Sequence, residues 1–395
     1  MLTFSGSVLG AEGASLRSQI ARFEAEHGLP VELRPTPDAA DQRHQLYVQW
    51  LNAWSTEPDV LQLDVVWTPE FAAAGWIRPL DDVLQSADAA DFFPAPMAAN
   101  RWRGRLYAVP WFVDVGILYW RTDLMPAPPE TFAALEAIAR RAIADKSAGS
   151  GFVWQGARYE GLVTVFLEYL VGYGGAILDA AGHVVVDSSA AVQALTAMYD
   201  SLYRDGIVPE AVLTWQEEQT RFAFQNGNAV FMRNWPYAAA LLRNPGESKV
   251  EGRFAVTVMP RANGRSAATL GGAQLAINAR SRHPGAAWAL IRYLTAPAQM
   301  LERAAATAQF PARRSVYDDA ALASSLAIAP AQARAIIERA VPRPVTPVYT
   351  QLSGILQIHL HRALTRQATP AAALSSAATE MRVLLQSLGL EQAAS

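Results

Sequence analysis

Short apolar runs alternate with segments of helical spacing along the first 70 residues. In the helical segments large apolar residues recur every three to four positions, as Leu16, Ile20 and Phe23 do before a stop at Gly28. The pattern predicts strands over 2–7, 30–33 and 60–67, a glycine-rich turn after the first strand, and helices over 16–28 and 42–54. Strands that alternate with helices favour a doubly wound α/β region with a largely parallel sheet, in which ligands bind at the carboxyl ends of the strands.

The segment 106–124, LYAVPWFVDVGILYWRTDL, predicts two strands joined by a short kinked crossing. Pro110 cannot donate a ladder hydrogen bond, so we expect the first strand to stop or bend there. Gly116 permits a bulge or a close backbone approach beside the lone carboxylate of Asp114. A buried carboxylate needs hydrogen-bonding partners. These are either protein groups around an ordinary structural aspartate or a ligand.

The rest of the chain continues the α/β pattern without an internal repeat or a low-complexity linker. Strands are predicted over 229–232, 254–259 and 273–278, with an extended stop at 310–312. Helices are predicted over 131–143, 162–170, 188–205, 219–225, 283–294, 329–340 and 352–388, the last divided by Pro370.

Composition narrows the class of protein. The 395 residues, 51% hydrophobic and 17% charged, are enough for two lobes of ordinary domain size. A net charge of −3 gives no electrostatic footprint for nucleic acid or an anionic membrane, and no apolar run is long enough to span a bilayer. The chain has no cysteine, which excludes disulfides, thiol catalysis and thiolate metal sites. Nearly every basic residue is arginine, so an arginine is weak evidence of a site.

Short motifs follow one another in a fixed order along nearly the whole chain. They include Gly10-Ala11-Glu12-Gly13, Asp64-Val65-Val66-Trp67, Tyr107–Asp123, Gln225-Asn226-Gly227-Asn228-Ala229, Trp235-Pro236, Gly271-Gly272 and Arg343-Pro344-Val345-Thr346-Pro347. Their order and spacing resemble the type 1 extracellular solute-binding proteins of ABC sugar importers, most closely the trehalose/maltose-binding branch.

The resemblance implies a type II periplasmic-binding-protein fold, with two α/β lobes, each a sheet flanked by helices. A sugar-binding cleft would lie between the lobes. Three hinge crossings are implied near 109–114, 256–260 and 310–313, and each of these segments is also a strand end marked by a proline. The predicted lobes are 1–110 plus 261–311 and 111–260 plus 312–395. Closure about the hinge on binding ligand is the expected motion.

Eight ligand-binding residues are implied by the same resemblance: Glu12, Arg43, Asp64, Asp114, Trp235, Tyr237, Gly272 and Arg343. Carboxylates and arginines would bind sugar hydroxyls, the two aromatic residues would cover the apolar face of the ring, and Gly272 would offer a backbone N–H.

Each assignment has an ordinary structural alternative. Glu12 could stabilise a helix N-terminus, and the two arginines could lie on the surface of an arginine-rich chain. Trp235 and Tyr237 share a face after a strand end and could belong to the core. Asp64 is hardest to explain structurally, because it interrupts an apolar strand.

The choice of sugar is predicted from one difference between this chain and many of its relatives. Many relatives have an aromatic residue shortly after the double glycine, whereas this chain has Ala273-Gln274. A smaller and more polar site favours a compact disaccharide, with trehalose as first choice and maltose next.

Two other functions stay open at this point. A glycoside hydrolase would need two of Glu12, Asp64 and Asp114 to face one bond, but paired arginines would hold them ionised and remove the general acid. A binder of another small polar solute on the same fold is the second alternative.

Taken together, the sequence predicts a non-catalytic, monomeric receptor without a metal or cofactor. We expect it to deliver a disaccharide to the permease subunits of an ABC transporter in the membrane. It would act in the periplasm, although these residues contain no signal segment.

Overall fold

The computed structural model describes residues 1–8, 10–37, 40–326 and 328–390. The chain forms two compact units: Met1–Val115 with Leu270–Tyr349 (unit 1), and Gly116–Thr269 with Thr350–Ser395 (unit 2). The chain therefore passes from one unit to the other at three places, after residues 115, 269 and 349.

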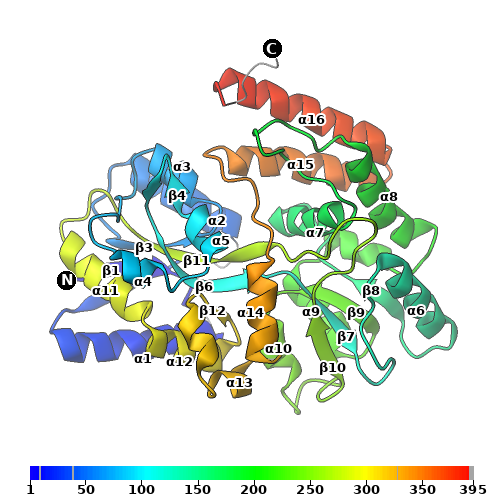
Figure 1. The fold of residues 1–395 in the computed structure, drawn as a ribbon, viewed down its shortest axis with the longest axis horizontal. Helices are drawn as coiled ribbons and strands as arrows, with labels where there is room; N and C mark the ends of the chain where they lie inside the picture. The colour runs from blue at the N-terminus through cyan, green and yellow to red at the C-terminus, as the bar shows by residue number, and fades with distance from the viewer. Residues whose placement is uncertain (9, 38–39, 327, 391–395) are drawn as a thin grey trace. The chain divides into compact units, whose positions relative to one another are not determined.

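A six-stranded mixed sheet forms the centre of unit 1 (Figure 1). Its strands, in spatial order, are β12 (Phe310–Pro311), β6 (Val109–Val115), β11 (Leu270–Ile277), β3 (Val60–Asp64), β1 (Leu2–Gly6) and β2 (Val31–Pro35). The first three strands in sequence are parallel, as predicted. The expectation of a largely parallel sheet is wrong for the other half, because β11 runs antiparallel to both β3 and β6, and β12 runs antiparallel to β6.

Helices cover the sheet of unit 1. They include α1 (Gly10–His27), α2 (Ala40–Asn52), α3 (Thr68–Ala73), α11 (Pro284–Leu294), α12 (Pro297–Thr307) and α14 (Pro330–Glu338). Tyr47 and Leu51 of α2 pack with Leu61 and Leu63 of β3 in one core cluster. Helix α1 lies beside α12, where Gln19 Nε2 donates to the carbonyl oxygen of residue 299 at 2.8 Å (Figure 1).

Short elements complete unit 1. They are α4 (Ser86–Ala89), α5 (Pro94–Ala99), the β4–β5 hairpin (Arg101–Trp102 with Arg105–Leu106), the 3₁₀ turn η2 (Arg314–Asp318) and α13 (Leu322–Ser325).

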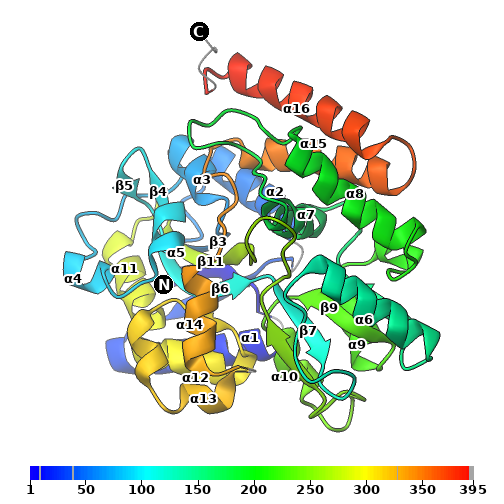
Figure 2. The same cartoon turned by 45° about the vertical axis from the view of Figure 1, so that its right-hand side comes forward.

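Unit 2 has a four-stranded mixed sheet in the order β10 (Phe254–Thr257), β7 (Ile117–Arg121), β9 (Ala229–Asn234) and β8 (Ser150–Val153). Helices α6 (Phe132–Ala144) and α9 (Glu217–Gln225) pack against β8 and β9 (Figure 2). Every residue of α7 (Glu160–Gly172) after the first is buried, as its apolar sequence predicts.

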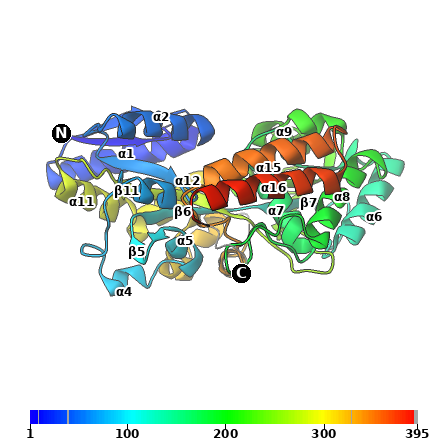
Figure 3. The same ribbon diagram turned by 90° about the horizontal axis from the view of Figure 1, so that it is seen from above.

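The remaining elements of unit 2 are α8 (Ser189–Tyr203), η1 (Glu210–Thr214), α10 (Ala238–Leu242), α15 (Tyr349–Leu364) and α16 (Pro370–Ser387). Helices α15 and α16 lie side by side, and His359 Nε2 lies 2.9 Å from Glu380 Oε1 between them (Figures 1 and 3).

Several boundaries differ from the prediction. Strand β6 runs through Pro110 and does not stop there. The pairing shifts at this point, because Ala273 and Gln274 of β11 face Phe112 and Pro110, which leaves Trp111 of β6 as an extra residue. Strand β3 ends at Asp64, and residues 65–67 form a turn that leads into α3. Helix α1 begins at Gly10, inside the predicted glycine-rich turn.

Residues 312–349 lie in unit 1, not in the second lobe to which the sequence assigned them. The cause is pairing with distant parts of unit 1. Arg313 NH1 binds Asp88 Oδ1 at 2.6 Å, and Arg343 NH2 binds Asp64 Oδ1 at 3.2 Å. The last two passages between the units consequently follow residues 269 and 349 and not the predicted crossings near 256–260 and 310–313.

Candidate functional site

Three neighbouring strand segments carry candidate residues of unit 1. The register of β11 sets Ala273 opposite Asp64 of β3, and Gly271 opposite Asp114 of β6. Gly272, between them, has a φ of +111°, and a Cβ there would lie 2.3 Å from the Phe112 carbonyl oxygen. Glycine is therefore required by the close approach of β11 to β6. Donation from the Gly272 N–H to a ligand stays a prediction.

Asp64 is held by Arg343, another of the eight predicted residues. Arg343 NH2 donates to Asp64 Oδ1 at 3.2 Å and also binds the Leu270 carbonyl oxygen at 3.4 Å. The Val66 N–H donates to the same Asp64 oxygen at 3.2 Å. Arg343 is buried, whereas the Asp64 side chain keeps 22% exposure. The arrangement fixes a carboxylate at the end of a strand with part of its surface open to solvent.

Glu12 meets two residues that the sequence did not single out. Its Oε1 accepts a hydrogen bond from Gln309 Nε2 at 3.0 Å, and its Oε2 pairs with Arg303 NH2 at 3.2 Å. Burial lowers the pKa of Arg303, and the charges of Glu12 and Asp114 oppose that shift. Two of the three predicted carboxylates, Glu12 and Asp114, therefore act on one buried guanidinium.

Arg303 also stacks on aromatic rings. Its Cζ lies 4.1 Å from the Trp111 ring centroid and 4.6 Å from that of Phe112. Arg303 is on α12, a helix that the sequence did not predict, and it looked like one more arginine of an arginine-rich chain. The one available signal was the helical spacing of apolar residues in PAQMLERAAAT.

Arg43 is buried and lies against Trp67, with Cζ 5.4 Å from the ring centroid. Within the described residues its Nε has no hydrogen-bond partner. Tyr47, one turn later, is a core residue whose hydroxyl donates to the Ser5 carbonyl oxygen at 2.9 Å. Arg43 is therefore no surface arginine, and its contact with ligand stays a prediction.

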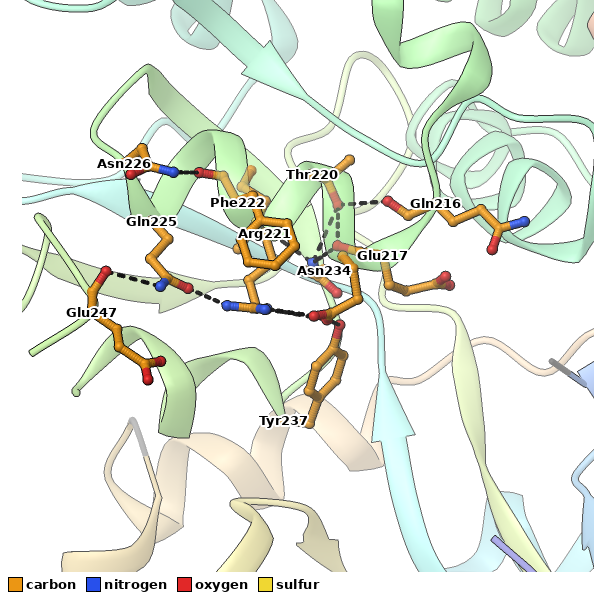
Figure 4. A network of polar contacts seen from close by, with 12 residues as sticks. Gln216, Glu217, Thr220, Arg221, Phe222, Gln225, Asn226, Asn234, Tyr237 and Glu247 are labelled. Carbon is orange, nitrogen blue, oxygen red and sulfur yellow. Dashed lines mark hydrogen bonds and ion pairs between the residues drawn. The ribbon is translucent and has the colours of Figure 1, made fainter. Parts of the chain in front are cut away.

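In unit 2 each predicted aromatic residue is tied to a glutamate at the start of α9. Trp235 Nε1 donates to Glu217 Oε1 at 3.3 Å, and the Tyr237 hydroxyl donates to Glu218 Oε1 at 2.7 Å. Arg221 also binds the Glu218 carboxylate, and Figure 4 shows Arg221 and Tyr237 in the surrounding network of polar contacts. Trp235 and Tyr237 are half-buried, which leaves ring surface accessible.

The pKa values follow from these contacts. Burial raises the pKa of Tyr237, and the neighbouring Glu218 raises it further. Partial burial opposes ionisation of Glu218, but hydrogen bonds from Arg221 and Tyr237 outweigh it and lower the pKa of Glu218. Sequence reasoning missed both glutamates. The signal was the Glu217-Glu218 pair at a helix start, which resembles ordinary N-terminal charge.

A cavity of about 580 Å³ lies elsewhere in unit 2, lined by α6, α7 and α8. Its rings, Phe132 and Tyr169, stack on each other with centroids 4.3 Å apart. Most of its charged groups are paired: Arg204 binds Asp200 and Asp205, and Glu136 binds Arg140. None of the eight predicted residues lines it, so we place the candidate site at the groups described above.

The described part of the chain contains no cluster of histidine, aspartate or glutamate suited to a metal ion. None of its helices is both long and apolar enough to cross a membrane.

These features define a class of protein. Each unit holds polar or aromatic side chains at strand ends, and two carboxylates of unit 1, Glu12 and Asp64, are hydrogen-bonded to buried arginines. Such groups suit the hydroxyls of a polar ligand. The class is that of ligand-binding proteins with an α/β fold.

Comparison with known proteins agrees. Residues 18–330 match the family model described as bacterial extracellular solute-binding protein, and the chain belongs to this family. It is therefore a solute-binding protein and not an enzyme, as predicted.

Individual relatives extend over almost the whole chain. A probable ABC transporter-binding protein of Deinococcus radiodurans is 34% identical over 389 residues, which are 95% of this chain and 91% of that protein. The solved structure of maltose-bound MalE3 of T. maritima is 40% identical, with a TM-score of 0.91 over 97% of this chain and 99% of that one. The maltotriose-bound maltotriose-binding protein of Thermus thermophilus shares the fold, with 20% identity and a TM-score of 0.80 over 98% of this chain and all of the other. The predicted periplasmic-binding-protein fold is confirmed.

Proposed function

We propose that this protein captures an α-linked disaccharide and delivers it to the permease of an ABC importer. The observation that carries the proposal is the Asp64–Arg343 pair. It presents a fixed, partly exposed carboxylate at a strand end beside the glycine pair of β11. Carboxylates held by arginine suit the hydroxyls of a sugar, because charge-assisted hydrogen bonds contribute about 1.5–3 kcal/mol each.

Each unit would supply a different part of the binding. Glu12, Asp64 and Asp114 of unit 1 would accept hydrogen bonds from hydroxyls, and Trp235 and Tyr237 of unit 2 would cover the apolar face of a sugar ring. Hinge closure is the motion expected to accompany binding. The protein would act outside the cytoplasmic membrane, in the periplasm.

Maltose and trehalose are the two candidate sugars. The 40% identical structure holds maltose, which supports maltose as a ligand of this chain. The preference for trehalose rests on Ala273-Gln274 alone. Gln274 is buried and within hydrogen-bond distance of Asn100, which weakens the idea that its amide replaces a ring in the site.

Isothermal titration calorimetry of the purified protein with trehalose, maltose, sucrose and maltotriose tests the proposal, together with an assay for released glucose. Saturable binding of one disaccharide without glucose release is the expected result. Glucose release would assign the carboxylates to catalysis, and no binding of any of the four sugars would overturn the proposal.

Site variants sharpen the test. We expect Asp64→Ala and Trp235→Ala to weaken binding of the sugar that the wild type binds. Asp187→Ala is a matched control, because Asp187 is also a partly exposed carboxylate paired with an arginine, Arg382, but lies on none of the candidate strand ends. Unchanged affinity in both site variants would contradict the assignment of the site.

A further inference from the structure

A completely buried ion pair lies in the middle of unit 2. Arg233 of β9 and Glu168 of α7 are both inaccessible to solvent, with NH2 to Oε1 at 2.6 Å and Nε to Oε2 at 2.9 Å. Gln155 completes the arrangement by accepting from Arg233 NH1 at 3.2 Å and donating to the Arg233 carbonyl oxygen at 3.0 Å. Burying two charges costs desolvation energy that their attraction often fails to repay, so such a pair is weak evidence of a contribution to stability alone.

The guanidinium also supports the candidate aromatic residue. Arg233 Cζ lies 4.0 Å from the centroid of the Trp235 ring. Because Arg233 is buried and Trp235 is half-buried, one face of the ring rests on the cation while ring surface remains exposed. The position of the ring thus depends on the position of the buried arginine.

Two chain segments that lead out of unit 2 meet the same pair. The Thr269 N–H donates to Glu168 Oε1 at 3.3 Å, and the Gly116 N–H donates to the Thr269 carbonyl oxygen at 3.1 Å. A Cβ on Gly116 would lie 1.7 Å from Glu168 Oε1 and 2.2 Å from Arg233 NH2. Gly116 and Thr269 are the residues of unit 2 at two of the three passages between the units.

We propose that Glu168 and Arg233 are positioning residues for ligand binding, which fix the Trp235 ring and the two passages at Gly116 and Thr269 in a single arrangement. Neither residue touches ligand, since both are buried. A change at the ring is transmitted through the guanidinium and carboxylate to the backbone at both passages. The part of this inference that concerns affinity rests on the proposed function, in which Trp235 contacts the sugar.

The first test is a double-mutant cycle on sugar affinity with Arg233→Lys and Trp235→Leu. Lysine keeps the charge but loses the planar group under the ring and the bond to Gln155. We expect Arg233→Lys to weaken binding about threefold to tenfold, the range of a cation–π contact. The same change in the Trp235→Leu background, which has no ring, should have much less effect, because arginine acts through the ring.

Arg121→Lys is the matched control. Arg121 is on the neighbouring strand β7, is nearly buried and pairs with Asp123 at 2.6 Å. We expect this variant to lose stability without losing affinity. Equal losses of affinity in Arg121→Lys and Arg233→Lys, or additive effects in the cycle, would show a merely structural pair and overturn the inference.

The second test needs no ligand and so separates failure of the inference from failure of the proposed function. Amide hydrogen exchange is compared among the wild type, Arg233→Lys, Glu168→Gln and Arg121→Lys, well below each unfolding temperature. We expect the amides of Gly116 and Thr269 to lose protection together in the first two variants and to keep it in Arg121→Lys. Unchanged protection in Glu168→Gln would overturn the inference even if no sugar tested binds the wild type.

Should Arg233→Lys fail to fold, Gly116→Ala addresses the same contact from the other side. Its methyl group must displace the carboxylate and the guanidinium, so affinity should fall and protection at Thr269 should fall with it. A folded Gly116→Ala variant with wild-type affinity and exchange would contradict the proposal.

Discussion

Each unit contains a buried arginine that contacts both a tryptophan and a glutamate. Which of these two partners is exposed differs between the units. In unit 1, Arg303 lies 4.1 Å from the Trp111 ring, and in unit 2, Arg233 lies 4.0 Å from the Trp235 ring. Each arginine is buried and each is paired with a glutamate.

The difference lies in which partner of the arginine is accessible. In unit 1 the Trp111 ring is buried and the Glu12 side chain keeps 32% exposure. In unit 2 the Glu168 side chain is completely buried and the Trp235 ring is half-buried. The same contacts therefore offer a carboxylate to a ligand in unit 1 and an aromatic surface in unit 2.

The largest expected effect concerns stability and separates the two glutamates. Glu168→Gln leaves a buried guanidinium without its counter-charge, and we expect the free energy of unfolding to fall by about 3 kcal/mol. Glu12→Gln should cost about 1 kcal/mol or less, because Glu12 is partly exposed and Asp114 still compensates Arg303. Urea unfolding of both variants measures the difference. Equal losses would contradict the contrast between the units.

The next effect concerns the carboxylates of unit 1. Asp64→Asn keeps the shape but removes the charge, so we expect sugar binding to weaken by about 2 kcal/mol, the value of one charge-assisted hydrogen bond. Calorimetric titration measures it. Asp187→Asn is the control, and a wild-type affinity in Asp64→Asn would show that Asp64 only orients Arg343.

A smaller effect separates the two tryptophans. Trp235→Phe should weaken sugar binding by about 1 kcal/mol, because a smaller ring covers less of the sugar face. Trp111→Phe should instead lower the free energy of unfolding, since it trims a completely buried ring. Thermal unfolding measures the stability of both variants, and titration measures their affinity for sugar. Lost affinity in Trp111→Phe with lost stability in Trp235→Phe would contradict these roles of the two rings.

The smallest effect is a dependence on pH in unit 2. The pKa of Glu218 is lowered from 4.5, so its ionised form stabilises the folded state above that pH, and the contribution is lost as the pH falls through the lowered pKa. The difference in unfolding free energy between wild type and Glu218→Gln should therefore stay constant above pH 4.5 and shrink below it. A difference in unfolding free energy that grows toward low pH would contradict a lowered pKa of Glu218.

Local sequence patterns were enough to predict most of the helices and strands. The α/β alternation of the first 70 residues, the buried helix 162–170 and the cap at Thr131 were all readable from spacing. The same holds for Asp64, whose position in an apolar run marked it as unusual. A similar signal at Glu168, a carboxylate inside a buried helix, went unused.

The remainder depends on contacts between distant parts of the chain. Residues 312–349 belong to unit 1, where Arg313 binds Asp88 and Arg343 binds Asp64, both far away in sequence. Arg303 acquires its role from Glu12, far away in sequence, on a helix with few large apolar residues. No local pattern carries such information.

Strand β11 has a consequence for how this protein is made. It lies between β3 and β6, yet the ribosome adds it long after both. Until then the nascent chain has open edges on both strands, and unpaired strand edges favour misassociation. We therefore expect folding of the sheet of unit 1 during synthesis to wait for residue 277, with chaperone contact concentrated on the chain before that point.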